Sequence, residues 1–146
     1  MLQRIPKRVL DCLAAVPLFS ACTKAELRTI ARLGTEIPAA DGTVLTQQGK
    51  PGFEFCLILA GNVRCLVDDT QVAVLSSGDF FGEMALLDHG PRHATVIADG
   101  PVRLLVLDAR EFSGMLDTSP SIVKKLLVSL AARERANASI HASIHH

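Results

Sequence analysis

Residues 80–96 read FFGEMALLDHGPRHATV. The stretch begins apolar, passes through Gly82 and the carboxylate of Glu83, makes one short helical turn, and reaches Arg92 before a strand-like run. Backbone N–H groups at the start of a short helix form an anion site. An arginine can grip phosphate with two hydrogen bonds, and a glutamate can accept hydrogen bonds from sugar hydroxyls. The stretch therefore predicts a nucleotide cradle.

The bulk composition indicates one globular domain. The chain has 146 residues, of which 49% are hydrophobic and 21% charged, so it can bury a single core. Its formal net charge is zero, which argues against direct nucleic-acid binding because such proteins usually carry a basic face. No apolar run is long enough for a membrane span, and Asp11 interrupts any signal-peptide core after the basic N-terminus. We expect a cytoplasmic protein with no membrane segment in this chain.

The cysteines and histidines give no metal pattern. The four cysteines form no C-x-x-C pair, which favours reduced and mostly buried thiols, although Cys56 and Cys65 could face each other across a hairpin. His141 and His145 have the spacing of neighbours on a helix, but a solvated tail explains them better than a metal site. We expect no metal and no cofactor.

Helical patterns occupy both ends of the chain. Apolar residues recur at helical spacing between residues 4 and 34, and Thr23 with Glu26 predicts a capping box. Asp108 with Glu111 repeats that spacing, and Pro120 is placed to open the longest helix. We expect N-terminal helices over 4–34 and C-terminal helices over 108–138, with the tail after residue 137 fraying.

The segment between the helices has the texture of a β protein. Short apolar runs over residues 35–107 alternate with turn signals, among them Gly61-Asn62 and Gly100-Pro101. Such spacing is typical of a β-sandwich, a barrel or a jelly roll. The predicted fold class is mainly β (α+β), with helices at both ends of one domain spanning residues 1–146.

The central stretch resembles a known family. Phe81-Gly82-Glu83-Met84-Ala85-Leu86, followed by Pro91-Arg92-x-Ala94-Thr95-Val96, is similar to the phosphate-binding cassette of cyclic nucleotide-binding domains. That family includes kinase regulatory subunits, catabolite activator proteins and cyclic-nucleotide-gated channels. The similarity extends over about Val16 to Ala136 and implies an eight-stranded jelly-roll β-barrel with the cassette at residues 80–96.

The resemblance also implies residue roles. Gly82 would let the backbone approach the ligand, Glu83 would accept from the ribose 2′-hydroxyl, and Arg92 would pair with the cyclic phosphate. Backbone N–H groups at the start of the short helix would meet the same phosphate. The ligand-binding set implied in this way is Phe81, Gly82, Glu83, Met84, Ala85, Arg92, His93 and Ala94.

His93 departs from the commoner family pattern. Many cAMP-binding members carry a small Ala or Ser after the arginine, whereas members that prefer cGMP often carry Thr. We expect cAMP as the ligand, with cGMP as the alternative. Because the chain has one matching arginine and no P-loop lysine, a singly charged cyclic phosphate fits better than a triphosphate.

The last helix is the implied lid. The residues that could cover the base are Leu126, Leu127, Leu130 and Arg133. Ligand binding would favour a position of this helix over the pocket and so signal to an unidentified effector protein or domain. The apolar stripe of the same helix could serve equally as a dimer seam.

Two other classes of function compete with a ligand sensor. A cupin-like enzyme would need a His-x-His metal set, and a hydrolase would need a nucleophile with a base; neither pattern is evident, so we expect no enzyme. An interaction domain that keeps the fold but has lost its ligand is the other alternative. The chain could also be the excised sensor of a channel or a transcription regulator.

Overall fold

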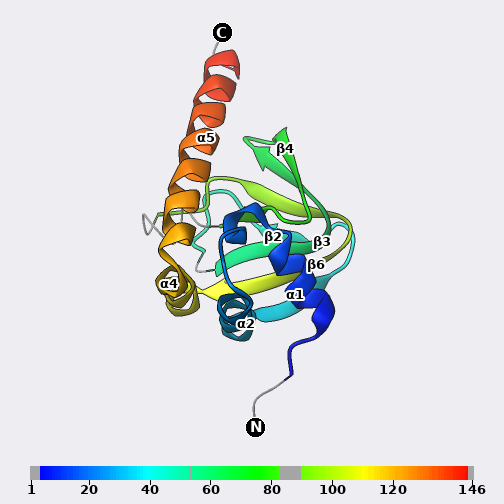
Figure 1. The fold of residues 1–146 in the computed structure, drawn as a ribbon. Coiled ribbons are helices and arrows are strands. Elements are labelled where there is room, and N and C mark those ends of the chain that lie inside the picture. The colour runs from blue at the N-terminus through cyan, green and yellow to red at the C-terminus, as the bar shows by residue number, and fades with distance from the viewer. Residues whose placement is uncertain (1–3, 53, 83–89, 145–146) are drawn as a thin grey trace.

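The computed structural model describes residues 4–52, 54–82 and 90–144, with side chains described as far as residue 132 and at Arg135. Helices occupy both ends of the chain and strands lie between them (Figure 1). The helical elements are α1 (Lys7–Ala14), the 3-10 turn η1 (Pro17–Phe19), α2 (Lys24–Leu33), α4 (Ala109–Thr118) and α5 (Pro120–Ile144). The strands are β1 (Thr35–Ala39), β2 (Val44–Thr46), β3 (Glu54–Val67), β4 (Thr70–Ser76), β5 (Phe80–Phe81) and β6 (Thr95–Asp108).

Both predicted capping boxes are present. Thr23 Oγ1 accepts the N–H of Glu26 at 3.1 Å, and the Glu26 carboxylate accepts the N–H of Thr23 at 2.8 Å. Asp108 and Glu111 make the same reciprocal pair, at 2.8 and 2.9 Å. Each box satisfies backbone donors that a first helical turn leaves unpaired, which is why α2 and α4 begin where they do. The last helix continues to Ile144, past the end expected at residue 138.

The strands form one antiparallel sheet. Strand β6 lies between β1 and β3, and β4 lies on the other side of β3. The two short strands attach to the long ones, β2 to β6 and β5 to β3. In Figure 1, α5 stands along one side of this sheet, and its C-terminal end extends away from the strands.

The eight-stranded barrel expected from the resemblance is not confirmed, because the described residues form six strands. The turn signals Gly61-Asn62 and Gly100-Pro101 lie inside β3 and β6, which are each 14 residues long. Strands β3 and β6 pair through this region with register shifts between Ile58 and Asn62. A bulge of this kind bends a strand without ending it. Residues predicted as two short strands therefore form one long strand in β3, and the same is true of β6.

Alternation along β3 divides the core into two clusters. Phe55, Leu57 and Leu59 belong to one cluster, whereas Cys56 and Ile58 belong to the other. Successive side chains of a strand point to opposite faces of its sheet. The first set packs against the helices and is called the helix-side cluster below. The second set packs among the strands and is called the strand-side cluster.

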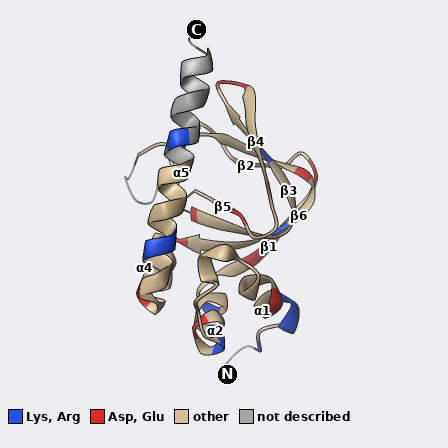
Figure 2. Cartoon of the chain, turned by 45° about the horizontal axis from the view of Figure 1, so that its top comes forward, with Lys and Arg blue, Asp and Glu red and all other residues tan. Residues whose placement is uncertain are grey.

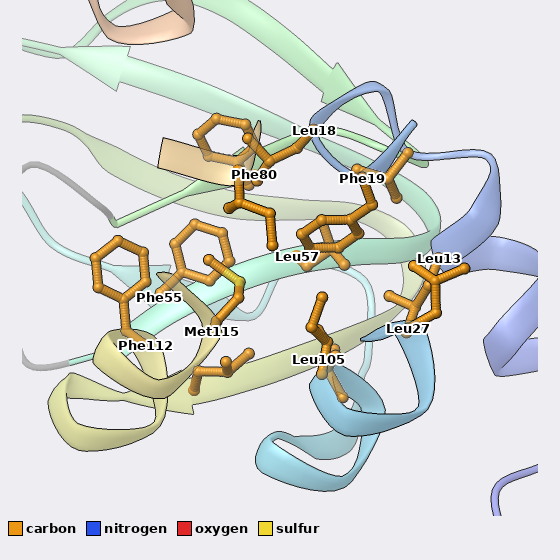
Figure 3. Packing of buried hydrophobic residues seen from close by; sticks show 14 of the residues in the cluster. Leu13, Leu18, Phe19, Leu27, Phe55, Leu57, Phe80, Leu105, Phe112 and Met115 are labelled. Atoms are coloured by element: carbon orange, nitrogen blue, oxygen red, sulfur yellow. The ribbon is translucent and has the colours of Figure 1, made fainter. Parts of the chain in front are cut away.

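The helix-side cluster holds the terminal helices onto the sheet (Figure 3). The Phe55 ring lies 5.5 Å from the Phe80 ring and 5.0 Å from the Phe112 ring, in tilted pairs. Leu13 from α1 and Ile122 from α5 are fully buried in the same cluster. Burying an aliphatic or aromatic side chain is worth about 1.5–3 kcal/mol, so this cluster supplies much of the attachment of the helices.

All four cysteines are free. Cys56 and Cys65 both lie on β3, in the strand-side cluster, so they do not face each other across a hairpin. Burial raises the pKa of the Cys56 thiol to about 12, with the nearby Glu54 carboxylate adding to the rise and the Arg92 charge opposing it. The thiol is therefore neutral over the ordinary pH range.

Candidate ligand-binding site

The last part of the stretch 80–96 is hydrogen-bonded to the end of β2 and the loop after it. The Gly49 N–H donates to the Arg92 carbonyl and the Arg92 N–H donates to the Lys50 carbonyl, both at 2.9 Å. Thr46 Oγ1 donates to the Ala94 carbonyl at 3.1 Å. Thr95 Oγ1 accepts the N–H of Gln48 at 3.0 Å. Residues 92–95, called the arginine arm below, are thus held by residues 46–50.

Arg92 is buried, with 8% of its surface exposed. Its Nη1 donates to the Gly82 carbonyl at 3.1 Å, and its Nη2 donates to the Glu54 carbonyl at 2.8 Å. Among the described residues it forms no ion pair within 4.0 Å. A guanidinium carries five N–H donors, so these two bonds leave donors for a further acceptor. A buried cation of this kind is suited to an anionic partner.

Two glycines make room for the Arg92 side chain. A Cβ at Gly52 would lie 1.7 Å from Nε of Arg92, and a Cβ at Gly82 would lie 2.5 Å from its Nη1. The Gly82 position would also bring a Cβ within 2.4 Å of the Glu54 carbonyl oxygen. With φ at +91°, Gly82 further adopts a backbone conformation that other residues rarely take. Any side chain here would displace the guanidinium.

The structure brings together part of the predicted ligand-binding set. Arg92 is bonded to the Gly82 carbonyl, Phe81 is buried in the strand-side cluster, and Ala94 is half-buried in the arginine arm. His93 is exposed. The predictions for Glu83, Met84 and Ala85 concern positions outside the described residues.

The predicted lid residues differ in their surroundings. Leu126 is buried in the helix-side cluster and Leu130 is half-buried against it. Leu127 is 61% exposed on α5. Arg133 lies on α5, but its side chain is outside the described part. Two of the four candidates therefore already contribute to the core.

Sequence reasoning missed several residues that shape the site. Gly52 reads in the sequence as an ordinary turn glycine, but in the structure the Arg92 side chain packs against it. The sequence also does not predict the contacts of the Glu54 carbonyl with Arg92 or of the Gln48 side chain with Asp68, because each joins segments far apart in the chain. The two glycines at positions 49 and 52 are the available sequence sign that another segment packs closely against this backbone.

The described residues show neither a metal-ion site nor a membrane-spanning helix. No group of three or more His, Cys, Asp or Glu side chains is placed to hold a metal ion. No described helix is long and apolar enough to cross a membrane.

The buried Arg92 and the two glycines beside it form a site suited to an anion, and comparison with known proteins gives the family. Residues 36–119 match the model of the cyclic nucleotide-binding domain. The chain belongs to the cyclic nucleotide-binding domain family.

Individual relatives agree with this assignment. The chain is 33% identical over 113 residues to a cAMP-dependent protein kinase regulatory subunit from Hypocrea atroviridis, which covers 77% of this chain and 24% of the relative. It is 38% identical over 113 residues to a cyclic nucleotide-gated potassium channel from Rhizobium etli, covering 77% of this chain and 32% of the channel. The chain thus spans about a quarter to a third of these relatives.

A solved structure shares the fold over most of the chain. The cAMP-bound PfPKA-R structure superposes with a TM-score of 0.85 at 25% identity, covering 92% of this chain and 47% of that one. The resemblance drawn from residues 80–96 is therefore confirmed at the level of the family.

Proposed function

We propose that this chain is a regulatory sensor domain, not an enzyme, that binds a cyclic nucleotide, with cAMP preferred, and couples binding to the position of α5. The observation that carries the proposal is the buried Arg92 guanidinium, set between Gly52 and Gly82 with donors available for an anion. Sequence similarity to a cAMP-dependent kinase regulatory subunit, and structural similarity to a cAMP-bound one, support the choice of ligand.

In this proposal each part of the site has one task. Arg92 pairs with the cyclic phosphate, and the backbone N–H groups of Met84 and Ala85 add further donors. Glu83 accepts from the ribose 2′-hydroxyl, and Gly82 keeps the backbone close to the ligand. Phe81 and Ala94 complete the walls, and His93 lies at the rim, where it can influence the choice between cAMP and cGMP.

The output in this proposal is a change in the equilibrium position of α5. A ligand shifts such an equilibrium only if it contacts one state better than the other. Leu127 is the exposed candidate for such a contact, whereas Leu126 and Leu130 would first have to leave the helix-side cluster. Arg133 is the fourth candidate. The effector that responds would be a protein or domain joined to this one.

Titration calorimetry with cAMP and with cGMP tests the proposal. We expect micromolar or tighter binding of cAMP to the wild-type chain and weaker binding of cGMP. Arg92→Ala should weaken cAMP binding about 30- to 1000-fold, because a charge partner of a buried phosphate is worth on the order of 2–4 kcal/mol.

Arg92 also bonds two carbonyls, so Arg92→Lys is the companion variant that keeps a cation in place. Circular dichroism must show that each variant is folded before affinities are compared. Unchanged cAMP affinity in folded Arg92→Ala would contradict the role of Arg92. No binding of either nucleotide by the wild-type chain at millimolar concentration would favour an interaction domain without a nucleotide ligand.

The movement of α5 has its own measurement. Amide hydrogen exchange over residues 123–132 should change when cAMP is added. Exchange that is identical with and without bound cAMP would contradict the coupling while leaving the binding proposal intact.

A further inference from the structure

A cleft of about 760 Å³ lies between η1, the turn from β4 to β5, and the first turns of α5. The described residues that line the cleft are Pro17, Leu18, Leu75, Gly78, Asp79, Phe80, Ser121, Lys124, Lys125, Val128 and Ser129. Its volume is within the range usual for small-molecule sites.

Strand β5 separates this cleft from the nucleotide site proposed above. Phe80 lines the cleft and belongs to the helix-side cluster, whereas Phe81 belongs to the strand-side cluster. Consecutive strand residues point to opposite faces, so the two rings point in opposite directions. Gly82 and Arg92, which continue from Phe81, do not line the cleft. The cleft therefore lies on the opposite face of β5 from Phe81.

The walls of the cleft are apolar. Leu18 and Phe80 are buried beneath it, and Leu75 is half-buried at its side. Val128 on α5 is 65% exposed. Val128 is a large hydrophobic side chain left in contact with solvent at the edge of an apolar cleft. A ligand with an apolar body would cover it and gain about 25 cal/mol for each Å² removed from water.

The α5 side of the cleft carries two ammonium groups. Lys125 is half-buried, and its Nζ donates to Ser20 Oγ at 2.5 Å, which anchors the side chain near the cleft. An ammonium has three donors, so the bond to Ser20 leaves donors for a ligand. Lys124 lies one residue earlier and is exposed.

One carboxylate also lines the cleft. The Asp79 side chain accepts the N–H of Ser76 at 2.9 Å and is thereby held against its own turn. The two lysines and this aspartate leave the described lining with one net positive charge. The cleft thus has apolar walls next to two ammonium groups, one of which is anchored by Ser20. This combination complements a molecule that is apolar at one end and carries one negative charge at the other.

We propose that this cleft is a second ligand site that binds a small amphiphilic carboxylate. The carboxylate pairs with Lys125 and Lys124, and the apolar body lies along Leu18, Phe80 and Val128. This inference stands on the cleft alone and does not depend on nucleotide binding at Arg92.

The test uses decanoate, below its micelle-forming concentration, and decanol as an uncharged probe of equal chain length. Amide NMR shifts of the wild-type chain should change saturably with decanoate at residues 75–80 and 121–129. Decanol should bind at the same residues but more weakly, because it lacks the charge. In the absence of cAMP, decanoate should leave the amide shifts of Gly82 and Ala94 unchanged.

Variants separate the roles of charge and apolar contact. Lys125→Gln should weaken decanoate binding roughly five- to tenfold and leave decanol binding unchanged, because a partly exposed charge pair is worth about 1 kcal/mol. Val128→Asp should weaken both probes on the order of tenfold by placing a carboxylate on the apolar wall. Val123→Asp makes the same change on α5 at a position that does not line the cleft, and should leave both affinities unchanged.

Three results would overturn the proposal. The first is the absence of saturable shifts at residues 75–80 and 121–129. The second is equal loss of decanoate binding in Val123→Asp and Val128→Asp, which would indicate unspecific association with α5. The third is displacement of decanoate by cAMP together with shifts at Gly82 and Ala94, which would place both molecules in one site.

Discussion

At the residue scale, the position of the Arg92 guanidinium depends on two glycines, because a side chain at either position would displace it. Arg92 occupies the space that Cβ atoms of Gly52 and Gly82 would need. Its two bonds to backbone carbonyls fix the guanidinium before any ligand arrives. A group held in position in this way loses less conformational freedom on binding, so less of the interaction energy is spent on ordering it.

Gly82→Ala should test this packing directly. We expect a loss of stability of roughly 2–4 kcal/mol, from the strained backbone and from contacts with the Glu54 carbonyl and Arg92. Gly42→Ala is the matched control, because Gly42 has φ of +80° but nothing within 4 Å of an added Cβ. Urea unfolding of both variants isolates the contact term. Equal losses in the two would show that the crowding at Gly82 is unimportant.

Cys56 gives a second residue-scale prediction. Because burial raises the pKa of its thiol to about 12, only about one thiol in 10⁴ is ionised at pH 8, and the thiolate is the reactive form. Iodoacetamide at pH 8 should therefore label the half-exposed Cys12 far faster than Cys56, as read by peptide mass spectrometry. In denaturant both should react at similar rates. Equal labelling of the two in the folded protein would contradict the burial of Cys56.

At the scale of elements, Gln48 connects the arginine arm to the tip of the β3–β4 hairpin. Its side chain donates to Asp68 Oδ1 at 3.0 Å and accepts the Asp68 N–H at 2.8 Å. Asp68 and Asp69 both have positive φ, at 51° and 63°, which is unusual for residues other than glycine. Figure 2 shows acidic residues at this tip. The bonds of Gln48 help to hold the tip in this conformation.

We predict that Gln48→Ala loosens the arginine arm. The amide protons of Gly49 and Arg92, which pair the loop with the arm, should exchange faster, and cAMP affinity should fall about three- to tenfold. Gln47→Ala is the control, since Gln47 is the exposed neighbour of the same residue type. Hydrogen exchange without ligand and calorimetry with cAMP are the two measurements. Unchanged exchange at Gly49 and Arg92 in Gln48→Ala would contradict the coupling.

At the scale of the whole molecule, one carboxylate ties the N-terminal helix to the sheet. Glu36 on β1 pairs with Arg8 of α1 at 2.6 Å and with Arg103 of β6 at 2.7 Å. The hydrogen bond from Arg8 is the main cause that lowers the pKa of Glu36, with Arg103 adding to it and burial opposing it. Both arginines are about half exposed, so solvent screens the pairs.

The lowered pKa of Glu36 fixes the sign of a pH effect. The stabilisation is fully present above pH 4.5, the ordinary value, and is lost as pH falls through the lower value of the folded state. Glu36→Gln should therefore lower Tm by about 2 °C at pH 7 and have no effect well below pH 4. Thermal unfolding at several pH values measures this, with the exposed Asp99→Asn as control. A Tm difference that persists unchanged at low pH would contradict the ion-pair explanation.

Sequence patterns predicted an element correctly where the interaction that forms it joins residues close together in the chain. The capping boxes at Thr23 and Asp108 were correct, because each is formed by residues three apart in sequence. The division of β3 at Gly61 was wrong, because a glycine permits a turn and a bulge equally. Pairing with β6 decides between them, and that pairing joins distant segments.

The sequence by itself determined the family, the terminal helices and the β-rich centre, and it predicted roles for Gly82 and Arg92 that remain proposals. These follow from short motifs and from periodicities of two or 3.6 residues, which need no distant partner. Only the tertiary structure decided that Gly52 and the Glu54 carbonyl hold Arg92, that Gln48 joins the arm to a hairpin, and that Phe80 and Phe81 belong to different core clusters. Each of those contacts joins segments whose meeting depends on strand register and helix packing, and a short sequence pattern does not encode either.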